Sequence, residues 1–501
     1  MIALVVAPNS KKELRYIKLK AECADVLELR VDYLKNFDFK SKFFNSKELK
    51  NLGKPIIVTN RKKEEGGRFL GSEEKRIEIL TKFRDGLNAD YLDIEHSTVR
   101  EKINELIKNK KNTKIIISYH NFNDTPNNLG DIYSDMGKLN PDLIKIVTTA
   151  NSIPDNFRVF DMILGAGNEG RKIIAFCMGE YGQFSRILSV ILGSQITYAS
   201  CENGKESARG QFTIDEMCNI YRMQKINSGT KIAGLIGNPV EHSWSHIMHN
   251  ASFDKLDINA VYLKFKVDKL KEFADYFKKL NVLGFSVTIP YKTQAMKCLD
   301  DINSKAEEIG AVNTIVVKNK KWIGYNTDCD GAMAALKEKT KLKGKNAVVL
   351  GAGGSARAVA YGLKENGAKI VILNRNTERA SKIAKDFKCN YGSLDELEDF
   401  YYDILINTTS VGMHPKANEC PIPPSLIRKN KIIFDIVFNP YKTRLLECAE
   451  KKGCTIIPGF EMLLNGAALQ FSLWTGKDAP VDFMRKKVIE HLGQKFLQQS
   501  C

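Results

Sequence analysis

The first 226 residues alternate short apolar runs with charged stretches of helical periodicity. The apolar runs, which are the predicted strands, occupy residues 2–7, 25–33, 55–61, 91–96, 114–120, 143–150, 172–179 and 195–200. Eight strands that alternate with helices are typical of a (β/α)8 TIM barrel. A doubly wound sheet is the alternative, but it would carry a glycine-rich turn after an early strand, and this half of the sequence has none. The pattern therefore predicts an α/β barrel over residues 1–226.

The pattern changes after a short linker, residues 226–231. Residues 231–330 hold short apolar strands that small polar residues interrupt, as in "GFSVTIPYK" and "GYNTDCDG". Further on, "NAVVLGAGGSA" (residues 346–356) has the form of a strand that runs into a glycine-rich turn and a helix. We therefore expect a small α/β domain over residues 231–330 and a Rossmann domain over residues 331–460.

The glycine-rich turn predicts a bound dinucleotide. Backbone N–H groups can approach a pyrophosphate closely at Gly351, Gly353, Gly354 and Ser355, where the helix begins. The next strand ends in Asn374 and Arg375, without the carboxylate that would hold a ribose 2′-hydroxyl. An arginine there suits a 2′-phosphate, with Arg379 as a second candidate, so NADP is favoured over NAD. A Rossmann-like domain that binds no nucleotide is the alternative.

In a TIM barrel the chemistry lies at the C-terminal ends of the strands. Lys145 lies between two isoleucines in the sixth predicted strand. We expect burial and neighbouring cations to lower its pKa and to free an amine that can attack a ketone. His120, at the end of the fifth strand, suits the base that the resulting iminium needs, and Arg61 and Arg186 suit a substrate carboxylate. The alternative is a structural lysine that pairs with a carboxylate of the second or fourth strand.

Six segments of the first half resemble the type I 3-dehydroquinate dehydratases: "ELRVDYL", "VTNRKKEEGGRF", "SYHNF", "LIKIV", "FSRI" and "SARGQF". The resemblance implies that Lys145 forms a Schiff base with the C3 ketone of 3-dehydroquinate. It implies that His120, oriented by Glu65, takes the C2 proton and assists the loss of water. The implied substrate-binding residues are Glu28, Arg30, Arg61, Arg186, Ser207 and Gln211. Asn121 and Arg209 depart from the family, which commonly has an aspartate and a proline there.

The stretch "EHSWSHIMHN", residues 241–250, holds three of the 7 histidines. A zinc site would need these ligands on one face and usually a further distant ligand. The sequence has no HExxH or CxxC motif, and the turn in "GNPV" puts His242 in a loop rather than on the following helix. We therefore expect no metal at this stretch and attach importance to its serines instead.

The same stretch, with "SVTIPYK", "GAVNT", "NTDCDG", "GAGGSARA", "INTTSVGM" and "FDIVFNP", resembles the shikimate dehydrogenases. The resemblance implies that Lys292 and Asp328 form a catalytic pair that moves a proton at the C3 oxygen during hydride transfer. It implies that residues 461–501 pack back on the substrate domain. The other implied contacts are Ser243, Ser245, Thr288 and Asn313 with the substrate, and Thr408, Ser410 and Gly459 near the nicotinamide.

Three residues of the second half depart from this family. Phe438 stands where a tyrosine usually contacts substrate, and Gly466 stands where a glutamine usually binds a substrate hydroxyl. Each lost hydrogen bond would cost about 1 kcal/mol of binding, unless Asn465 or a water compensates. His246 replaces a proline, and this extra histidine creates the apparent cluster.

The composition narrows the class of protein. The formal net charge is +17, but no zinc finger, RNA-binding aromatic signature or basic helix accompanies it, so we expect no nucleic-acid partner. No run reaches the ~18 apolar residues of a membrane helix, and "MIALVVAPNS" predicts a first strand rather than a signal peptide. The 11 cysteines are scattered, which favours free thiols in a reducing cytosol.

The order of the two resembled enzymes is chemically consistent, because the first makes 3-dehydroshikimate and the second reduces it. We expect a cytosolic chain that carries two consecutive steps of the shikimate pathway on small-molecule substrates, and we leave its oligomeric state open. One alternative is a dehydratase joined to a quinate/shikimate dehydrogenase, which would use quinate and prefer NAD. The other is a non-enzymatic metabolite sensor, which should have lost its catalytic residues.

Overall fold

The structure is a computed structural model that describes residues 1–8, 11–34 and 46–499. Two compact units make it up. The first consists chiefly of Met1–Thr230, and the second chiefly of Lys231–Ile258 and the residues from Phe277 onward, with the residues between them divided between the two units. Among the described helices, none combines the length and the apolar character that a membrane span requires.

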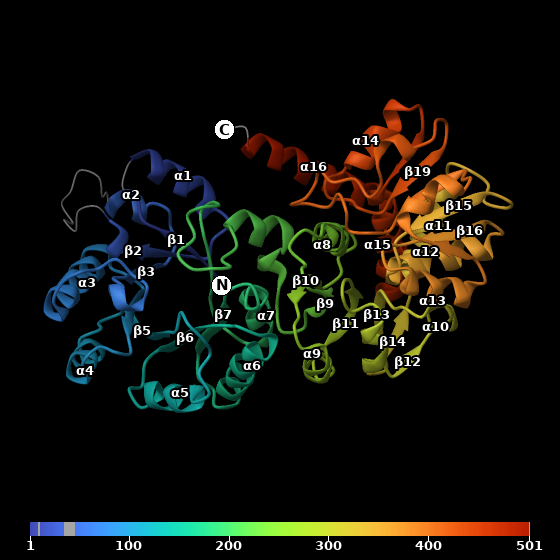
Figure 1. Ribbon diagram of the computed structural model, residues 1–501. Helices are drawn as coiled ribbons and strands as arrows, with labels where there is room; N and C mark the ends of the chain where they lie inside the picture. The colour runs from blue at the N-terminus through green and yellow to red at the C-terminus, as the bar shows by residue number, and fades with distance from the viewer. Residues whose placement is uncertain (9–10, 35–45, 500–501) are drawn as a thin grey trace. The chain divides into compact units, whose positions relative to one another are not determined.

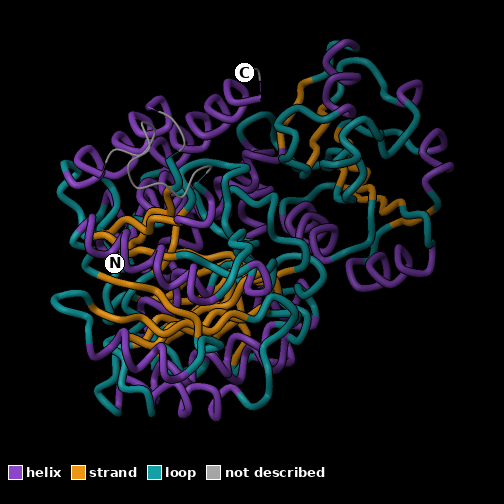
Figure 2. Tube along the Cα trace, turned by 90° about the vertical axis from the view of Figure 1, so that its left-hand side faces the viewer, coloured by secondary structure: helices purple, strands orange, loops and turns teal. Residues whose placement is uncertain are grey.

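An eight-stranded parallel sheet forms the first unit and curves into a barrel with helices outside it (Figure 1 and Figure 2). Its strands are β1 (Ile2–Val6), β2 (Val26–Arg30), β3 (Ile56–Thr59), β4 (Tyr91–Glu95), β5 (Lys114–His120), β6 (Leu143–Thr149), β7 (Ile173–Met178) and β8 (Thr197–Ala199). The spatial order is β7-β6-β5-β4-β3-β2-β1-β8, so the strands follow one another without the reversal of a doubly wound sheet. The predicted barrel is confirmed.

The helices of the first unit are α1 (Lys11–Ala21), α2 (Ser46–Lys50), α3 (Glu73–Leu87), α4 (Arg100–Lys108), α5 (Leu129–Gly137), α6 (Ile153–Asn168) and α7 (Ser185–Leu192). Local signals in the sequence start two of them. Ser72 accepts a hydrogen bond from the N–H of Lys75 at the start of α3, and Ser152 and Asp155 form a capping box at α6. Every residue of β6 is buried, since the barrel interior covers one face and the helices cover the other.

A six-stranded mixed sheet begins the second unit, in the order β10-β9-β11-β13-β14-β12. Its strands are β9 (Lys231–Gly237), β10 (Ala260–Lys266), β11 (Val282–Val287), β12 (Asp301–Ile302), β13 (Thr314–Lys318) and β14 (Lys321–Tyr325). Its helices are α8 (Ser245–Lys255) and α10 (Ser304–Ile309), whereas α9 (Leu270–Phe277) belongs to the first unit apart from its last residue. β9 and β11 are parallel, whereas β13 is antiparallel to β11 and β14.

A parallel Rossmann-type sheet follows, in the order β17-β16-β15-β18-β19-β20. Its strands are β15 (Asn346–Leu350), β16 (Lys369–Leu373), β17 (Asn390–Gly392), β18 (Ile404–Asn407), β19 (Ile432–Asp435) and β20 (Thr455–Pro458). Its helices are α11 (Thr327–Lys337), α12 (Gly354–Glu365), α13 (Thr377–Phe387) and α14 (Arg444–Lys451). The strand order reverses between β15 and β18, and ligands of open α/β sheets bind at such a point.

Two helices close the chain, α15 (Gly459–Thr475) and α16 (Val481–Gln499). α15 lies against α11 and also contacts α8, β11 and β13 of the mixed sheet, while α16 packs on α8. The C-terminal segment therefore returns to the mixed sheet and to α8. This return brings side chains of α15 to the site described below.

Candidate active sites

A small cavity opens at the C-terminal ends of the barrel strands. Its walls include all nine residues that the sequence analysis assigned to the first site: Glu28, Arg30, Arg61, Glu65, His120, Lys145, Arg186, Ser207 and Gln211. They come together because parallel strands of a closed barrel end at the same rim. Seven lining residues lie outside the prediction, among them Phe122 and Tyr198.

Lys145 is held by carboxylates at the base of this cavity. Its Nζ donates to Asp93 Oδ2 at 2.9 Å, lies 3.6 Å from Glu28 Oε1 and is 4.1 Å from the centre of the Tyr198 ring. Burial lowers the pKa of Lys145, but Asp93, Tyr198 and Glu28 outweigh it, so the pKa is raised. The prediction of a lowered pKa was wrong, because the nearest charge to the ammonium is the Asp93 carboxylate rather than an arginine.

Asp93 also holds Arg61. The Arg61 guanidinium donates to Asp93 Oδ1 at 2.7 Å and to Ser118 Oγ at 2.6 Å, so in this structure it binds a carboxylate of the protein. Burial alone would raise the pKa of Asp93, but Arg61 and Lys145 lower it well below its usual range. Asp93 therefore stays charged and holds both cations, Lys145 and Arg61, in the cavity wall.

Arg186 differs from Arg61 in its surroundings. It is buried, its Nε has no hydrogen-bond partner among the described residues, and its side chain donates only to the carbonyl of Arg209 at 3.2 Å. Its guanidinium lies over the Phe176 ring, 4.7 Å from the ring centre. Burial lowers the pKa of Arg186 to about 9. A buried cation that faces a cavity in this way is suited to an incoming carboxylate.

His120 is uncharged at neutral pH, because burial, Arg61 and Lys145 lower its pKa well below the usual value. Its Nδ1 has no hydrogen-bond partner among the described residues. Glu65 lines the same cavity, but its Oε1 accepts a hydrogen bond from Ser97 Oγ at 2.5 Å rather than from the imidazole. The predicted orientation of His120 by Glu65 is therefore not a direct contact in this structure.

The remaining predicted residues are held by neighbours. Arg30 forms a two-point ion pair with Asp32 at 2.9 and 2.7 Å. Glu28 accepts a hydrogen bond from Thr59 at 2.9 Å. The Ser207 hydroxyl and backbone N–H both donate to Gln211 Oε1, at 3.1 and 2.8 Å, which fixes the loop at the rim of the cavity.

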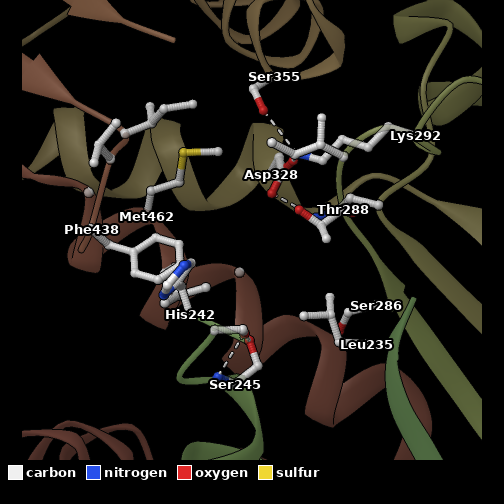
Figure 3. Close-up of a pocket in the computed structure, with 18 of the residues that line it drawn as sticks. Leu235, His242, Ser245, Ser286, Thr288, Lys292, Asp328, Ser355, Phe438 and Met462 are labelled. Atoms are coloured by element: carbon white, nitrogen blue, oxygen red, sulfur yellow. Dashed lines mark hydrogen bonds and ion pairs between the residues drawn. The ribbon is translucent and has the colours of Figure 1, made fainter. Parts of the chain in front are cut away.

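A larger cavity, about 240 Å³, lies in the second unit between the mixed sheet and the Rossmann sheet (Figure 3). Ten predicted residues line it: Ser243, Ser245, Thr288, Lys292, Asn313, Asp328, Ser355, Thr408, Ser410 and Gly459. Phe438 and Gly466, the two departures from the resembled family, line it as well. The structure therefore brings together side chains from seven stretches of sequence that the motifs had marked separately.

Lys292 and Asp328 form the ionic centre of this cavity (Figure 3). Lys292 Nζ donates to Asp328 Oδ2 at 2.5 Å and to Ser355 Oγ at 2.9 Å. The other carboxylate oxygen of Asp328 accepts a hydrogen bond from Asn313 Nδ2 at 2.8 Å. Asp328 lies in the first turn of α11, which Asn326 caps, so its carboxylate stands beside the positive end of the helix dipole.

Two of the three histidines of residues 241–250 lie in different surroundings. His242 lines the cavity, and its ring centre lies 5.3 Å from that of His414. His249 is fully buried on α8 against Tyr262 and Trp474. The two serines between them lie together at the cavity wall, where Ser243 Oγ donates to Ser245 Oγ at 3.1 Å.

The glycine-rich turn between β15 and α12 has open space beside Gly353, where a Cβ would meet nothing within 4 Å. Gly351 has φ +113°, and a Cβ there would lie 2.7 Å from Thr408 Oγ1. A Cβ on Gly354 would lie 3.1 Å from Lys292 Cβ, and no side chain caps the first N–H groups of α12. Arg375 and Arg379 are exposed just beyond β16, where Asn374 donates to the carbonyl of Asn376. This arrangement fits a dinucleotide with a 2′-phosphate.

Gln470 is a cavity residue that the sequence analysis missed. It lies on α15 one helical turn after Gly466, and its Oε1 accepts a hydrogen bond from Ser286 at 2.8 Å while its Nε2 donates to Thr314 at 3.0 Å. Asn465, the predicted substitute for the absent glutamine, has a buried Nδ2 without a partner among the described residues. The i, i+4 spacing from Gly466 was the signal that could have found Gln470.

These folds and cavities define a class: an enzyme with a lysine-centred barrel site and a separate dinucleotide site. Family models agree with both halves. The type I 3-dehydroquinase model matches residues 1–228, and the shikimate dehydrogenase substrate-binding domain matches residues 235–315. The shikimate/quinate 5-dehydrogenase model matches residues 333–437, and the shikimate 5′-dehydrogenase C-terminal domain matches residues 459–489.

Known proteins with these activities are similar in sequence to the chain. The bifunctional 3-dehydroquinate dehydratase/shikimate dehydrogenase of Arabidopsis thaliana, described as chloroplastic, is 37% identical over 91% of this chain and 78% of its own. The shikimate dehydrogenase (NADP(+)) of Pyrococcus abyssi is 46% identical over 53% of this chain and 99% of its own. A crystal structure of a shikimate dehydrogenase in complex with NADP+ is 41% identical, covers 53% of this chain and 96% of its own, and has a TM-score of 0.51. The chain belongs to the family of bifunctional 3-dehydroquinate dehydratase/shikimate dehydrogenases, and both resemblances drawn from the motifs are confirmed.

Proposed function

We propose that the chain converts 3-dehydroquinate to 3-dehydroshikimate in the barrel and reduces 3-dehydroshikimate to shikimate with NADPH in the second unit. One observation carries the proposal: Lys145 and Lys292 line different cavities, and each cavity holds its own proton-accepting side chain. The assignment of roles to individual residues is part of the proposal.

In the barrel, Lys145 Nζ attacks the C3 ketone and water leaves, which forms an iminium. The attack requires the neutral amine, so the ammonium that Asp93 and Glu28 stabilise must first lose its proton. The iminium acidifies the neighbouring carbon, and neutral His120 accepts the C2 proton. Hydroxide leaves the next carbon as water when His120 returns the proton, and hydrolysis of the imine frees Lys145. Arg186 holds the substrate carboxylate.

In the second unit, NADPH supplies hydride when it is bound, and Arg375 and Arg379 suit its 2′-phosphate. The names of the relatives, which are NADP(+) enzymes, support this cofactor. Lys292, ordered by Asp328 and Ser355, delivers a proton to the C3 oxygen as the alcohol forms. The hydroxyls of Ser243 and Ser245 hold the carboxylate, and the amides of Asn313 and Gln470 orient the ring hydroxyls from the cavity wall.

The test supplies purified protein with 3-dehydroquinate and NADPH, and follows the enone absorbance of 3-dehydroshikimate together with NADPH consumption. Wild type should consume NADPH. Lys145→Ala should stop dehydration and leave the reduction of added 3-dehydroshikimate intact, and Lys292→Ala should do the reverse. Loss of both reactions in either folded variant would contradict the assignment of one lysine to each reaction.

A dehydrogenase of altered preference is the second candidate, because Phe438 and Gly466 both line the cavity. Gly466 lacks the side-chain amide that the family's glutamine has at this position, and Gln470 provides an amide one helical turn away. This favours shikimate over quinate as the substrate. Comparable oxidation of quinate and shikimate, or a preference for NAD, would support the alternative.

A reducing cytosol suits the cysteines, each of which is a free thiol among the described residues. Fractionation of cells that express the natural protein would test this location, and an organelle fraction that held both activities would contradict it.

A further inference from the structure

A buried tyrosine hydroxyl joins two parts of the cavity wall in the second unit. Tyr262, on β10, is fully buried and does not itself line the cavity. Its hydroxyl donates to Ser286 Oγ at 2.8 Å and also hydrogen-bonds the Ser245 hydroxyl. Ser286 and Ser245 both line the cavity, and Figure 3 shows them on its wall.

The Ser286 hydroxyl continues this link to the ionic centre. It donates to Gln470 Oε1 at 2.8 Å, and Gln470 Nε2 donates to Thr314 Oγ1 at 3.0 Å. Thr314 donates to Asn313 Oδ1 at 2.9 Å, and Asn313 Nδ2 donates to Asp328 Oδ1 at 2.8 Å. Six side chains thus form one hydrogen-bonded chain from Tyr262 to the carboxylate that pairs with Lys292.

The direction of every bond in this chain follows from one backbone group. Asn313 Oδ1 accepts the backbone N–H of Thr327 at 2.7 Å, so this atom is the amide oxygen and the Thr314 hydroxyl must donate to it. Thr314 has no second proton and accepts from Gln470, which turns Gln470 Nε2 towards Thr314 and Oε1 towards Ser286. Ser286 donates its proton to that oxygen and therefore accepts the proton of Tyr262.

We infer that Tyr262 is a positioning residue for the reduction, acting through Ser286 on the position of the Gln470 amide. Without the phenol proton, the Ser286 hydroxyl loses a buried donor and can rotate. Gln470 Nε2 stays turned towards Thr314, but Oε1 loses its fixed partner when Ser286 rotates, so the amide is held at one end only and shifts relative to the substrate hydroxyls. Substrate binding weakens, whereas Lys292, Asp328 and the dinucleotide turn keep their contacts. The inference rests on the proposed reduction of 3-dehydroshikimate.

The experiment measures KM and kcat for 3-dehydroshikimate at saturating NADPH, and Kd for NADPH, in wild type and Tyr262→Phe. Tyr402→Phe is the matched control. Tyr402 is also fully buried, and its hydroxyl donates to the carbonyl of Leu426 at 3.1 Å and accepts the N–H of Arg428, away from the cavity. The dehydratase activity of the same chain provides an independent check that each preparation is active.

Tyr262→Phe should raise KM by about five- to tenfold, the loss expected for one buried hydrogen bond. It should change kcat by less than about twofold and leave Kd for NADPH unchanged, and Tyr402→Phe should leave all three unchanged. In a Gln470→Ala background, Tyr262→Phe should raise KM by less than about twofold, since it acts through that amide. Ser286→Ala, which removes the same link from the other end, should reproduce the rise in KM if Tyr262→Phe folds poorly.

An unchanged KM in folded Tyr262→Phe or Ser286→Ala would overturn the inference. A rise in KM of about five- to tenfold when Tyr262→Phe is added to Gln470→Ala would also overturn it. A fall in kcat with KM unchanged would indicate a structural role for Tyr262 instead. Failure of wild type to reduce 3-dehydroshikimate with NADPH would instead refute the proposed function itself.

Discussion

The folding stability of the second unit should depend on pH through His249. This side chain is fully buried, 4.6 Å in ring-centre distance from Tyr262 and 5.0 Å from Trp474. Burial lowers the pKa of His249 to about 3, and the Gln470 amide acts only weakly against it. Protonation of this imidazole would leave a charge among aromatic rings, so the folded unit holds it neutral.

The magnitude follows from the difference between the folded and unfolded pKa values. In the unfolded chain the imidazole binds a proton below about pH 6.5, whereas in the folded unit it does so only below about pH 3. The stabilisation from His249 is therefore complete above about pH 6.5 and decreases by about 1.4 kcal/mol per pH unit down to about pH 3. Between about pH 7.5 and about pH 5 the free energy of unfolding should fall by about 2 kcal/mol through this group.

Tryptophan fluorescence reports on the unfolding of the second unit, because the 3 tryptophans, Trp244, Trp322 and Trp474, all belong to it. Urea unfolding at the two pH values should show that His249→Phe loses about 2 kcal/mol less than wild type. Burial raises the pKa of Asp435 to about 6, which makes an opposite contribution, but that contribution is common to both proteins and cancels in the comparison. His414→Asn, at an exposed histidine, is the control and should behave as wild type. Equal losses in wild type and His249→Phe, within about 0.5 kcal/mol, would refute the reasoning.

Three further predictions concern activity. Arg375→Ala combined with Arg379→Ala should raise KM for NADPH by about ten- to a hundredfold and leave that for NADH unchanged, because charge-assisted contacts with the 2′-phosphate are lost; an equal rise for both cofactors would contradict this. Phe438→Tyr should raise kcat/KM for 3-dehydroshikimate by about fivefold if its hydroxyl reaches the substrate, and a decrease would exclude that contact. Borohydride with 3-dehydroquinate should block dehydration but not reduction, and mass spectrometry should find the adduct on Lys145; labelling elsewhere would remove Lys145 from its assigned role.

The motifs predicted most of each cavity because their residues lie at the ends of regular elements. Parallel strands bring their C-terminal ends to one rim, so the sequence order of Glu28, Arg61, His120 and Lys145 is enough to expect that they meet. The dinucleotide turn could be predicted from a single short segment, because its strand, its three glycines and its helix follow one another in the sequence. Such predictions need only the period of the pattern and the rules of parallel sheets.

The pKa shift of Lys145 and the rotation of α15 about its axis could not be predicted in this way. The sign of the Lys145 pKa shift depends on whether Asp93 or an arginine lies nearer to the ammonium, and these side chains come from different strands. Asn465 and Gln470 are both close to Gly466 in sequence, but the rotation of α15 turns Gln470 into the cavity and leaves Asn465 outside the hydrogen-bonded network.

The sequence alone determined the barrel, the Rossmann domain and the family, and it predicted the two lysines that line the cavities, because these follow from local periodicity and from motifs with fixed spacing. Only the tertiary structure decided which charges neutralise each other, which amide faces the substrate cavity and how Tyr262 is joined to Asp328. These properties depend on distances of a few ångströms between side chains far apart in the chain. Coulomb energy and hydrogen bonding change steeply over such distances, whereas the hydrophobic pattern of a strand or helix is insensitive to them.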